Sequence, residues 1–140
     1  MARIVLKECF VEINGVDLSD HCESIEISIE KDEVEATTFA TGGGTEQMHG
    51  LKQDSFQVTL HTDYAVGSVN ATLQPLLDGE LEFPVVIRPN ASASVSATNP
   101  NYTADCKLFS LPALSGSPGD LAKVQVDLKP QRTGIAIETS

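Results

Sequence analysis

The chain has 140 residues, of which 41% are hydrophobic and 21% are charged. This length fits one domain around a single core. Twenty acidic residues against nine basic ones give a formal net charge of −11, which argues against a surface that grips nucleic acid phosphates. Two tyrosines, five phenylalanines and no tryptophan leave few aromatic side chains for stacking bases or sugars.

The cellular location is predicted from apolar segments and cysteines. The N-terminus has no apolar segment long enough for a signal peptide, and no run approaches the ~18 apolar residues of a membrane span. Cys9, Cys22 and Cys106 are odd in number and widely spaced, which suits reduced thiols better than a disulfide framework. The sequence therefore predicts a protein made in the cytoplasm that does not contact a membrane.

The first residues of the chain predict a β-hairpin. A short strand is expected from Cys9 to Ile13, and Asn14-Gly15 follows it. Both central positions of a tight hairpin turn need positive φ, which asparagine and glycine adopt readily. Residues 16–18 return from this turn, and residues 19–21 predict a polar bend.

Two stretches that alternate between apolar and polar residues organise the chain, Glu23 to Glu35 and Gln53 to Thr62. Side chains alternate across a strand with period two, so each stretch predicts a strand with one buried and one wet face. Between them, Thr37 to Gly50 is too long for a tight turn and rich in glycine, which predicts a flexible loop. The predicted buried residues are Ile25, Ile27, Ile29, Phe56, Val58 and Leu60, and the wet ones include Glu26, Ser28, Glu30, Asp32, Gln57, Thr59 and His61.

One helix is expected after the second strand. Apolar residues at i, i+4, i+7 and i+8 predict a helix from Val66 to Leu77, with Thr62-Asp63 as its cap and Gly79 as its end. Pro75 within this segment indicates a short or kinked helix.

The second half of the chain predicts further strands. They span Leu81 to Arg88, Asn90 to Asn99, Thr103 to Leu111 and Leu121 to Lys129. Pro84 places the first of them at a sheet edge or a bulge. The second is poor in large apolar residues and has a mobile tip. Residues 133–139 form either a last edge strand or an extended arm. The chain is thus predicted to be one mainly β domain, a two-sheet β-sandwich or partly open barrel with one α-helix.

Candidate catalytic and metal-binding residues are few. His61 and Asp63 share a wet face with no third ligand nearby in sequence, and His21 and Cys22 point to opposite faces of a strand. Residues 42–44 are three glycines without the lysine of a phosphate loop, and Glu46 would repel a phosphate. The sequence predicts neither an enzyme nor a cofactor or metal site.

The row Glu26, Ser28, Glu30 and Asp32 is acidic. It suits an ordinary solvated strand face, and a straight row has poor geometry for Ca²⁺, which needs clustered oxygens on a bent loop. This acidic row can have a functional role only if many copies of the chain align their rows around a shared space.

Several segments together resemble phage major tail proteins, the tail tube family. The N-terminal half of that family is matched by Asn14-Gly-Val-Asp-Leu-Ser-Asp-His21, by the acidic strand and by Val34-Glu-Ala-Thr-Thr-Phe39. Its C-terminal half is matched by Ser55-Phe-Gln-Val-Thr-Leu60, the single helix, Asn99-Pro-Asn-Tyr102 and Gly119-Asp120. The resemblance covers nearly all 140 residues.

This resemblance implies a structural virion protein whose hexameric rings stack into a tube, with strands joining across subunits into a larger barrel. DNA passes through the lumen without specific binding, and the partners are other copies, a tape-measure protein and terminator or tip proteins. A ring of six would carry −66 formal charges, so its bore would repel phosphates. The virion would be assembled in the host cytoplasm. A monomeric or trimeric β-sandwich binding module, such as a capsid decoration or carbohydrate-binding domain, is the alternative; it would need an exposed aromatic platform.

The resemblance also assigns residues to two surfaces. Residues 41–50 form a flexible loop to the neighbouring ring, and residues 1–8 and 130–140 serve as terminal arms. The predicted lumen-facing residues are Glu26, Ser28, Glu30, Gln57, Thr59 and His61, and the predicted inter-ring residues are Thr41, Gly42, Gly43, Gly44, Glu46, Gln47, Met48 and His49.

Overall fold

A computed structural model describes residues 5–112 and 114–139, with Thr41 described by its backbone alone. It contains ten strands, one α-helix and two 3₁₀ turns within these residues. None of the described residues forms a helix that is both long and apolar enough to span a membrane. The elements are β1 (Phe10–Ile13), β2 (Val16–Asp17), η1 (Ser19–His21), β3 (Cys22–Ser28), β4 (Lys31–Glu35), η2 (Phe39–Thr41), β5 (Gln47–Lys52), β6 (Ser55–His61), α1 (Val69–Asp78), β7 (Glu82–Arg88), β8 (Asn101–Leu108), β9 (Lys123–Pro130) and β10 (Ala136–Glu138).

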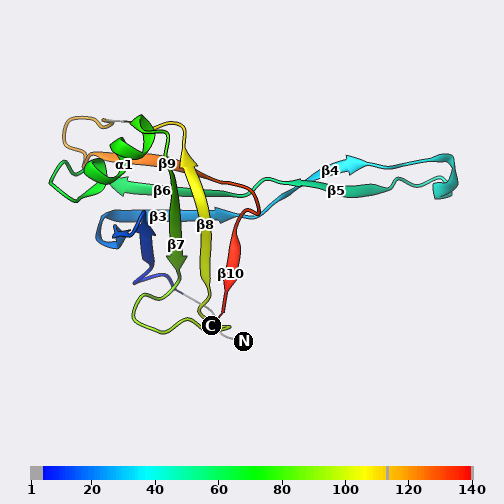
Figure 1. The fold of residues 1–140 in the computed structure, drawn as a ribbon, viewed down its shortest axis with the longest axis horizontal. Coiled ribbons are helices and arrows are strands. Elements are labelled where there is room, and N and C mark those ends of the chain that lie inside the picture. The colour runs from blue at the N-terminus through cyan, green and yellow to red at the C-terminus, as the bar shows by residue number, and fades with distance from the viewer. Residues whose placement is uncertain (1–4, 113, 140) are drawn as a thin grey trace.

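Eight of the strands form one antiparallel sheet. Its order is β2-β1-β7-β8-β9-β6-β3, and β10 pairs with β8. Strands β8 and β9 share only three residue pairs, and in Figure 1 β3, β6 and β9 run across β1, β7 and β8. The sheet thus folds over on itself into two layers, which we call the body together with α1. The predicted mainly β, two-layered fold is confirmed, with both layers belonging to one continuous sheet.

The hydrophobic core lies between these two layers. Alternation along each strand turns every second side chain inward, as predicted for β6, where Phe56, Val58 and Leu60 are fully buried. The opposite layer and β9 complete the core with Val11, Ile13, Phe83, Val85, Ile87, Cys106, Leu108, Val124, Val126 and Leu128. Ile25 and Ile27 are half-buried at its margin. The predicted burial of Ile29 is wrong, because β3 ends at Ser28 and Ile29 is 45% exposed.

Turn chemistry explains the N-terminal hairpin. Asn14 and Gly15 have φ of 52° and 80°, the left-handed values that a two-residue hairpin turn needs. The turn pairs β1 with β2, as predicted.

Helix α1 starts later than predicted. It begins at Val69, and Val66 is fully exposed, because Gly67 at φ 77° interrupts the chain before the helix. Asp63 is therefore not a helix cap; its carboxylate instead accepts a hydrogen bond from the Ala65 N–H and closes a turn. Val69, Leu73 and Leu76 pack into the core, and Gly79 ends the helix as predicted.

Strand β7 lies inside the sheet, between β1 and β8, so the expectation that Pro84 marks an edge or bulge is wrong. N–H and C=O of one residue point to the same side of an antiparallel strand. The Pro84 carbonyl accepts a hydrogen bond from Asn14 N, at the turn where β1 has ended. The missing N–H of the proline therefore removes no bond from the regular ladder.

The predicted strand over Asn90 to Asn99 is also wrong. These residues form a loop with one isolated bridge, from Ser96 to Asn99. The buried Asn99 amide holds the loop closed by donating to the carbonyls of Asn90, Ala93 and Ser94. A local side-chain network thus replaces a strand ladder.

Part of each chain end bonds to the body where the structure describes it. Residues 136–138 pair with β8 as β10. Glu8 accepts hydrogen bonds from Ala91 N at its carbonyl and from the Ser92 hydroxyl at its carboxylate. Residues 1–4 and 140, also expected in the arms, lie outside the described residues.

The first of the two long organising strands breaks into β3 and β4, and β5 is a separate strand that precedes the second, β6. Backbone pairing continues across the break, where Gln53 N donates to Glu30 O. Beyond it β4 and β5 pair with each other alone and project from the body as a ribbon, which we call the arm (residues 31–52; Figure 1). The predicted flexible loop over residues 37–50 is therefore wrong at its end, because residues 47–50 belong to β5.

Candidate functional site

One face of the body, formed by the outward side chains of β3, β6 and β9, is entirely polar. Because the three strands pair in register, its residues form rows across the sheet. One row joins Glu26, Gln57 and Asp127, and the next joins Ser24, Thr59 and Gln125. We call this surface the polar face; it comprises Glu23, Ser24, Glu26, Ser28, Ser55, Gln57, Thr59, His61, Lys123, Gln125, Asp127 and Lys129.

The charge of the polar face is much lower than that of the chain. Three acids against two lysines leave a net charge of −1 with histidine neutral, out of −11 for the whole sequence. Its acidic character is concentrated in the row of Glu26 and Asp127. The positive charges lie at its two ends, on Lys123 and Lys129.

At one end of the polar face, Glu23 lies beside a lysine and a histidine. Its carboxylate lies 2.9 Å from Lys123 Nζ and 3.6 Å from His61 Nε2. The hydrogen bond from Lys123 is the main cause that lowers the pKa of Glu23. Glu23 occupies the irregularity where the register of β3 and β6 shifts. All of these groups are largely exposed, so they contribute little stability.

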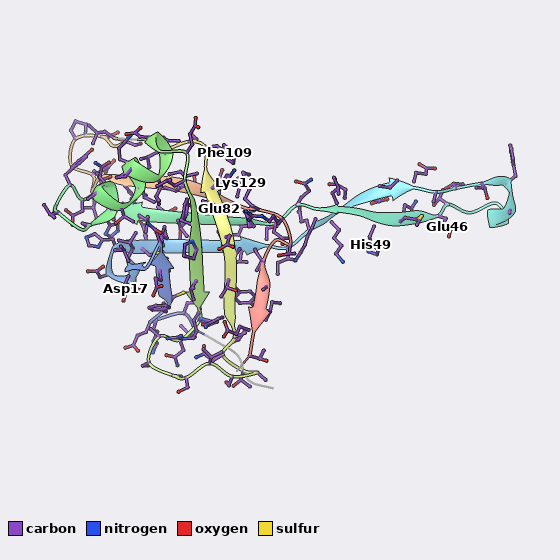
Figure 2. All side chains as sticks on the ribbon, in the orientation of Figure 1. Asp17, Glu46, His49, Glu82, Phe109 and Lys129 are labelled. Atoms are coloured by element: carbon purple, nitrogen blue, oxygen red, sulfur yellow. The ribbon has the colours of Figure 1, made fainter. Side chains whose placement is uncertain are left out.

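The arm has no core of its own. Every residue of β4 is exposed, and the apolar residues Val34, Phe39, Met48 and Leu51 are between 50% and 111% exposed. A two-stranded ribbon in water is marginally stable at best. Gly50 lets the two strands approach, since a Cβ there would lie 2.9 Å from Val34 Cγ2. Figure 2 shows the side chains of Glu46 and His49 on this ribbon, away from the body.

The tip of the arm is an ordered turn. Thr37 closes it by accepting from Glu46 N and donating to Glu46 O, and Ala36 N also donates to Glu46 O. The 3₁₀ turn η2 is capped by Thr38, whose hydroxyl accepts from Ala40 N, and ends at Gly42 in the left-handed conformation. These bonds hold Phe39 fully in solvent at the far end of the ribbon.

A third cluster surrounds His21. Its Nδ1 lies 2.8 Å from Asp20 Oδ1, and its Nε2 lies 2.8 Å from Asp63 Oδ2. The hydrogen bond to Asp20 is the largest cause that raises the pKa of His21; burial, the next largest, opposes it, and the bond to Asp63 adds to the rise. The pKa of Asp63 is lowered, chiefly by the Ala65 N–H and then by the Ser68 hydroxyl and His21.

The His21 cluster has the residue types of a hydrolase triad but not its hydrogen bonds. Ser68 Oγ is 3.4 Å from His21 Nε2, yet the hydroxyl donates to Asp63 Oδ2 at 2.8 Å. Because the same carboxylate oxygen also faces Nε2, that nitrogen is not free to take the serine proton. The cluster instead ties the start of β3 to the loop before α1. His61 and Asp63, which the sequence places on one wet face, therefore have different partners. Asp63 contacts His21, and His61 contacts Glu23.

No group of three or more His, Cys, Asp or Glu side chains within the described residues is arranged to hold a metal ion. The buried Cys106 thiol has its pKa raised to about 12 by burial, and that of Cys22 is raised to about 11 for the same reason. Such thiols stay protonated and are poor nucleophiles.

Known proteins resemble this chain in structure rather than in sequence. No protein-family model and no curated protein matches it. A chain in the extended sheath/tube terminator of the PVC extracellular contractile injection system has a TM-score of 0.73 at 13% identity, over 99% of this chain and 98% of that one. A chain of the native gene transfer agent virion gives 0.71 at 11% identity, over 95% of each chain. A chain of the SPP1 tail tube gives 0.69 at 11% identity, over 94% of this chain and 77% of that one. This chain has the tail-tube fold.

Within the tail-tube fold, the residues predicted for the lumen lie mostly together. Five of the six belong to the polar face, as outward residues of β3 and β6. Glu30, the sixth, lies between β3 and β4, at the base of the arm. The predicted inter-ring residues lie on the outer half of the arm, Gly42, Gly43, Gly44 and Glu46 at its tip and Gln47, Met48 and His49 in β5; only the backbone of Thr41 is described, at the end of η2.

Sequence reasoning missed the most buried charged residue of this tail-tube fold. Asp54 lies within the predicted strand from Gln53 to Thr62 but was assigned no role there, and its side chain has no exposed surface. The signal in the sequence is weak, because its partners are backbone groups and a lysine two residues before it. Only the return of the C-terminal segment to the base of the arm buries this carboxylate.

Proposed function

We propose that this protein is a structural subunit of a phage-type tail tube, in which hexameric rings stack around a lumen that conducts DNA. The observation that carries the proposal is the match of the fold, over nearly the whole chain, to chains from tail tubes and tube terminators. A related chain belongs to the tail of an empty gene transfer agent particle solved with C6 symmetry, at a TM-score of 0.64 and 15% identity. The protein would then reside in the virion and act without catalysis.

The exposed arm is consistent with self-assembly. A ribbon that exposes Val34, Phe39 and Met48 gains stability only when another surface covers it. In a stacked tube that surface would belong to a neighbouring ring. Because the tip of the arm is already ordered, less conformational entropy is lost when it docks.

The polar face is consistent with a lumen wall. Strand β3 ends the order of strands in the sheet, so one of its edges is open to pairing with a neighbouring subunit. A ring built that way would place six polar faces around one space. Their summed charge would be about −6 rather than −66, so the wall repels phosphates mainly through the row of Glu26 and Asp127.

The proposed partners are other copies of the chain, terminator and tip proteins at the tube ends, and a tape-measure protein in the lumen before DNA enters. The alternative of a binding module would need aromatic side chains gathered on one surface. The exposed aromatic residues lie in three separate segments, with Phe39 on the arm tip, Tyr64 before α1 and Phe109 after β8.

Negative-stain electron microscopy of the purified protein tests this proposal. We expect six-fold rings or tubes, whose abundance rises with protein concentration. The matched sample lacks the outer arm and should give rings or single subunits only. A protein that stays monomeric at every concentration and salt condition would contradict the proposed function.

A further inference from the structure

The arm meets the body at a buried ionic cluster, which we call the arm joint (Lys52, Asp54 and residues 133–135). Asp54 Oδ2 accepts from Ile135 N at 2.8 Å and lies 3.1 Å from Lys52 Nζ, while Oδ1 accepts from Glu30 N at 3.2 Å. Lys52 Nζ also donates to the carbonyl of Ile135 at 2.9 Å and to that of Thr133 at 3.4 Å.

The joint connects three segments that are distant in sequence. Glu30 lies between β3 and β4, Lys52 ends β5 with Asp54 two residues after it, and Ile135 precedes β10. Ile135 is buried in the core, so the carboxylate of Asp54 links both strands of the arm to a fixed point of the body. A fully buried carboxylate is costly unless it is paired with a cation and hydrogen-bonded, and here Lys52 and two backbone N–H groups meet it.

Gly134 makes this contact feasible. Its φ of +74° favours glycine, and a Cβ at this position would lie 2.4 Å from Asp54 Oδ2 and 3.1 Å from Lys52 Cδ. The backbone must therefore come closer to the carboxylate than any side chain would allow. The glycine is needed by the joint and by the turn at once.

Little else fixes the direction of the arm. Its own strands pair only with each other, and among the described residues one backbone bond, from Gln53 N to Glu30 O, connects their ladder to that of the body. A ribbon held by one ladder bond can bend and twist at that point. The joint adds contacts from a third segment, which restrains the ribbon from a different side.

We infer that Asp54 is a positioning residue, which holds the arm in its projecting direction before any partner binds. Arm, joint and β10 then move as one unit with the body. The consequence for assembly rests on the proposed function: a pre-oriented arm meets the neighbouring copy with less entropy to lose.

Residual dipolar couplings of the backbone amides test the inference on the monomeric subunit, with the monomer checked by sedimentation. In the wild type, one alignment tensor should fit both the body and the arm. In Asp54→Asn, which keeps the shape but removes the charge facing Lys52, the arm couplings should fall by at least half while the body couplings stay unchanged. The matched control is Asp32→Ala, an exposed aspartate at the same end of the arm that contacts the Gln53 amide; its couplings should equal those of the wild type.

A second variant keeps the test decisive if Asp54→Asn does not fold. Lys52→Met retains the backbone donors to Asp54 and removes the bridge to residues 133–135, and it should lower the arm couplings relative to Asp32→Ala. Unchanged arm couplings in either folded variant would overturn the inference. Tube formation is scored separately. Wild-type protein that forms no tubes contradicts the proposed function. If the wild type forms tubes but the variants keep unaltered couplings, only the positioning role of Asp54 is contradicted.

Discussion

The body and the arm are both built from paired antiparallel strands, but their side chains differ in environment. In the body, Phe56, Val58 and Leu60 are fully buried, and polar residues alternate with them. In the arm, Val34 and Met48 are directly paired across the ribbon yet remain at least half exposed. The comparison teaches that strand pairing needs only backbone hydrogen bonds, whereas a stable strand needs a second layer to cover its apolar face. The body supplies that layer itself, and the arm requires another molecule.

Removing the arm should have the largest effect on assembly and almost none on folding. Lys31 and Lys52 are cross-strand partners, so residues 32–51 can be replaced by an Asn-Gly turn that leaves the arm joint in place. We expect an unchanged melting temperature and a complete loss of tubes, measured by calorimetry and electron microscopy. Tubes of normal length from this variant would show that the arm does not connect rings.

A core substitution should destabilise the body strongly. Leu60 is fully buried, so Leu60→Ala should cost about 2–5 kcal/mol of unfolding free energy. The matched substitution in the arm is Met48→Ala, at a residue that is 61% exposed, and it should change the same quantity by less than about 0.5 kcal/mol. Urea unfolding of both variants measures the difference. Similar losses in the two would mean that the arm is covered within the monomer.

The His21 cluster should make the stability of the body depend on pH. Because the folded state raises the pKa of His21, the contribution is fully present below the unfolded value of about 6.5 and is lost as pH rises through the folded value. The melting temperature of the wild-type protein should therefore fall as pH rises across this window, and His21→Gln should reduce that fall. His49→Gln in the arm is the control and should behave as wild type; a His21→Gln profile that matches wild type would contradict the role of the cluster.

Charge reversal on the polar face should have the smallest effect on stability. Glu26 is exposed, so Glu26→Lys should change unfolding free energy by less than about 0.5 kcal/mol. In the proposed ring it would place six lysines in each layer and slow DNA transit by attracting phosphates, most strongly at low salt. Ejection rate across a salt series measures this, with Glu33→Lys in the arm as the control. Normal ejection at low salt from tubes that contain the variant would show that Glu26 does not face the lumen.

The sequence alone determined where most strands of the body lie and which of their faces are wet. The period-two alternation of β6 placed its buried residues correctly, and Asn14-Gly15 placed the first hairpin, because both signals depend on local geometry. Local patterns failed where a distant segment decided the outcome. Pro84 is tolerated inside the sheet because the turn of β1 lies beside it.

Only the tertiary structure decided where the body stops and the arm begins. The apolar alternation of Ile25 and Ile27 runs to Ile29, one residue past the end of β3 at Ser28, so it does not mark the break. The body covers the strands only as far as β9 and the C-terminal segment reach, and at that limit Asp54 is buried by the backbone around Gly134. These contacts join residues about 80 positions apart in sequence, which alternation, capping and turn rules do not relate. The division between a self-sufficient body and a dependent arm is therefore a property of long-range packing.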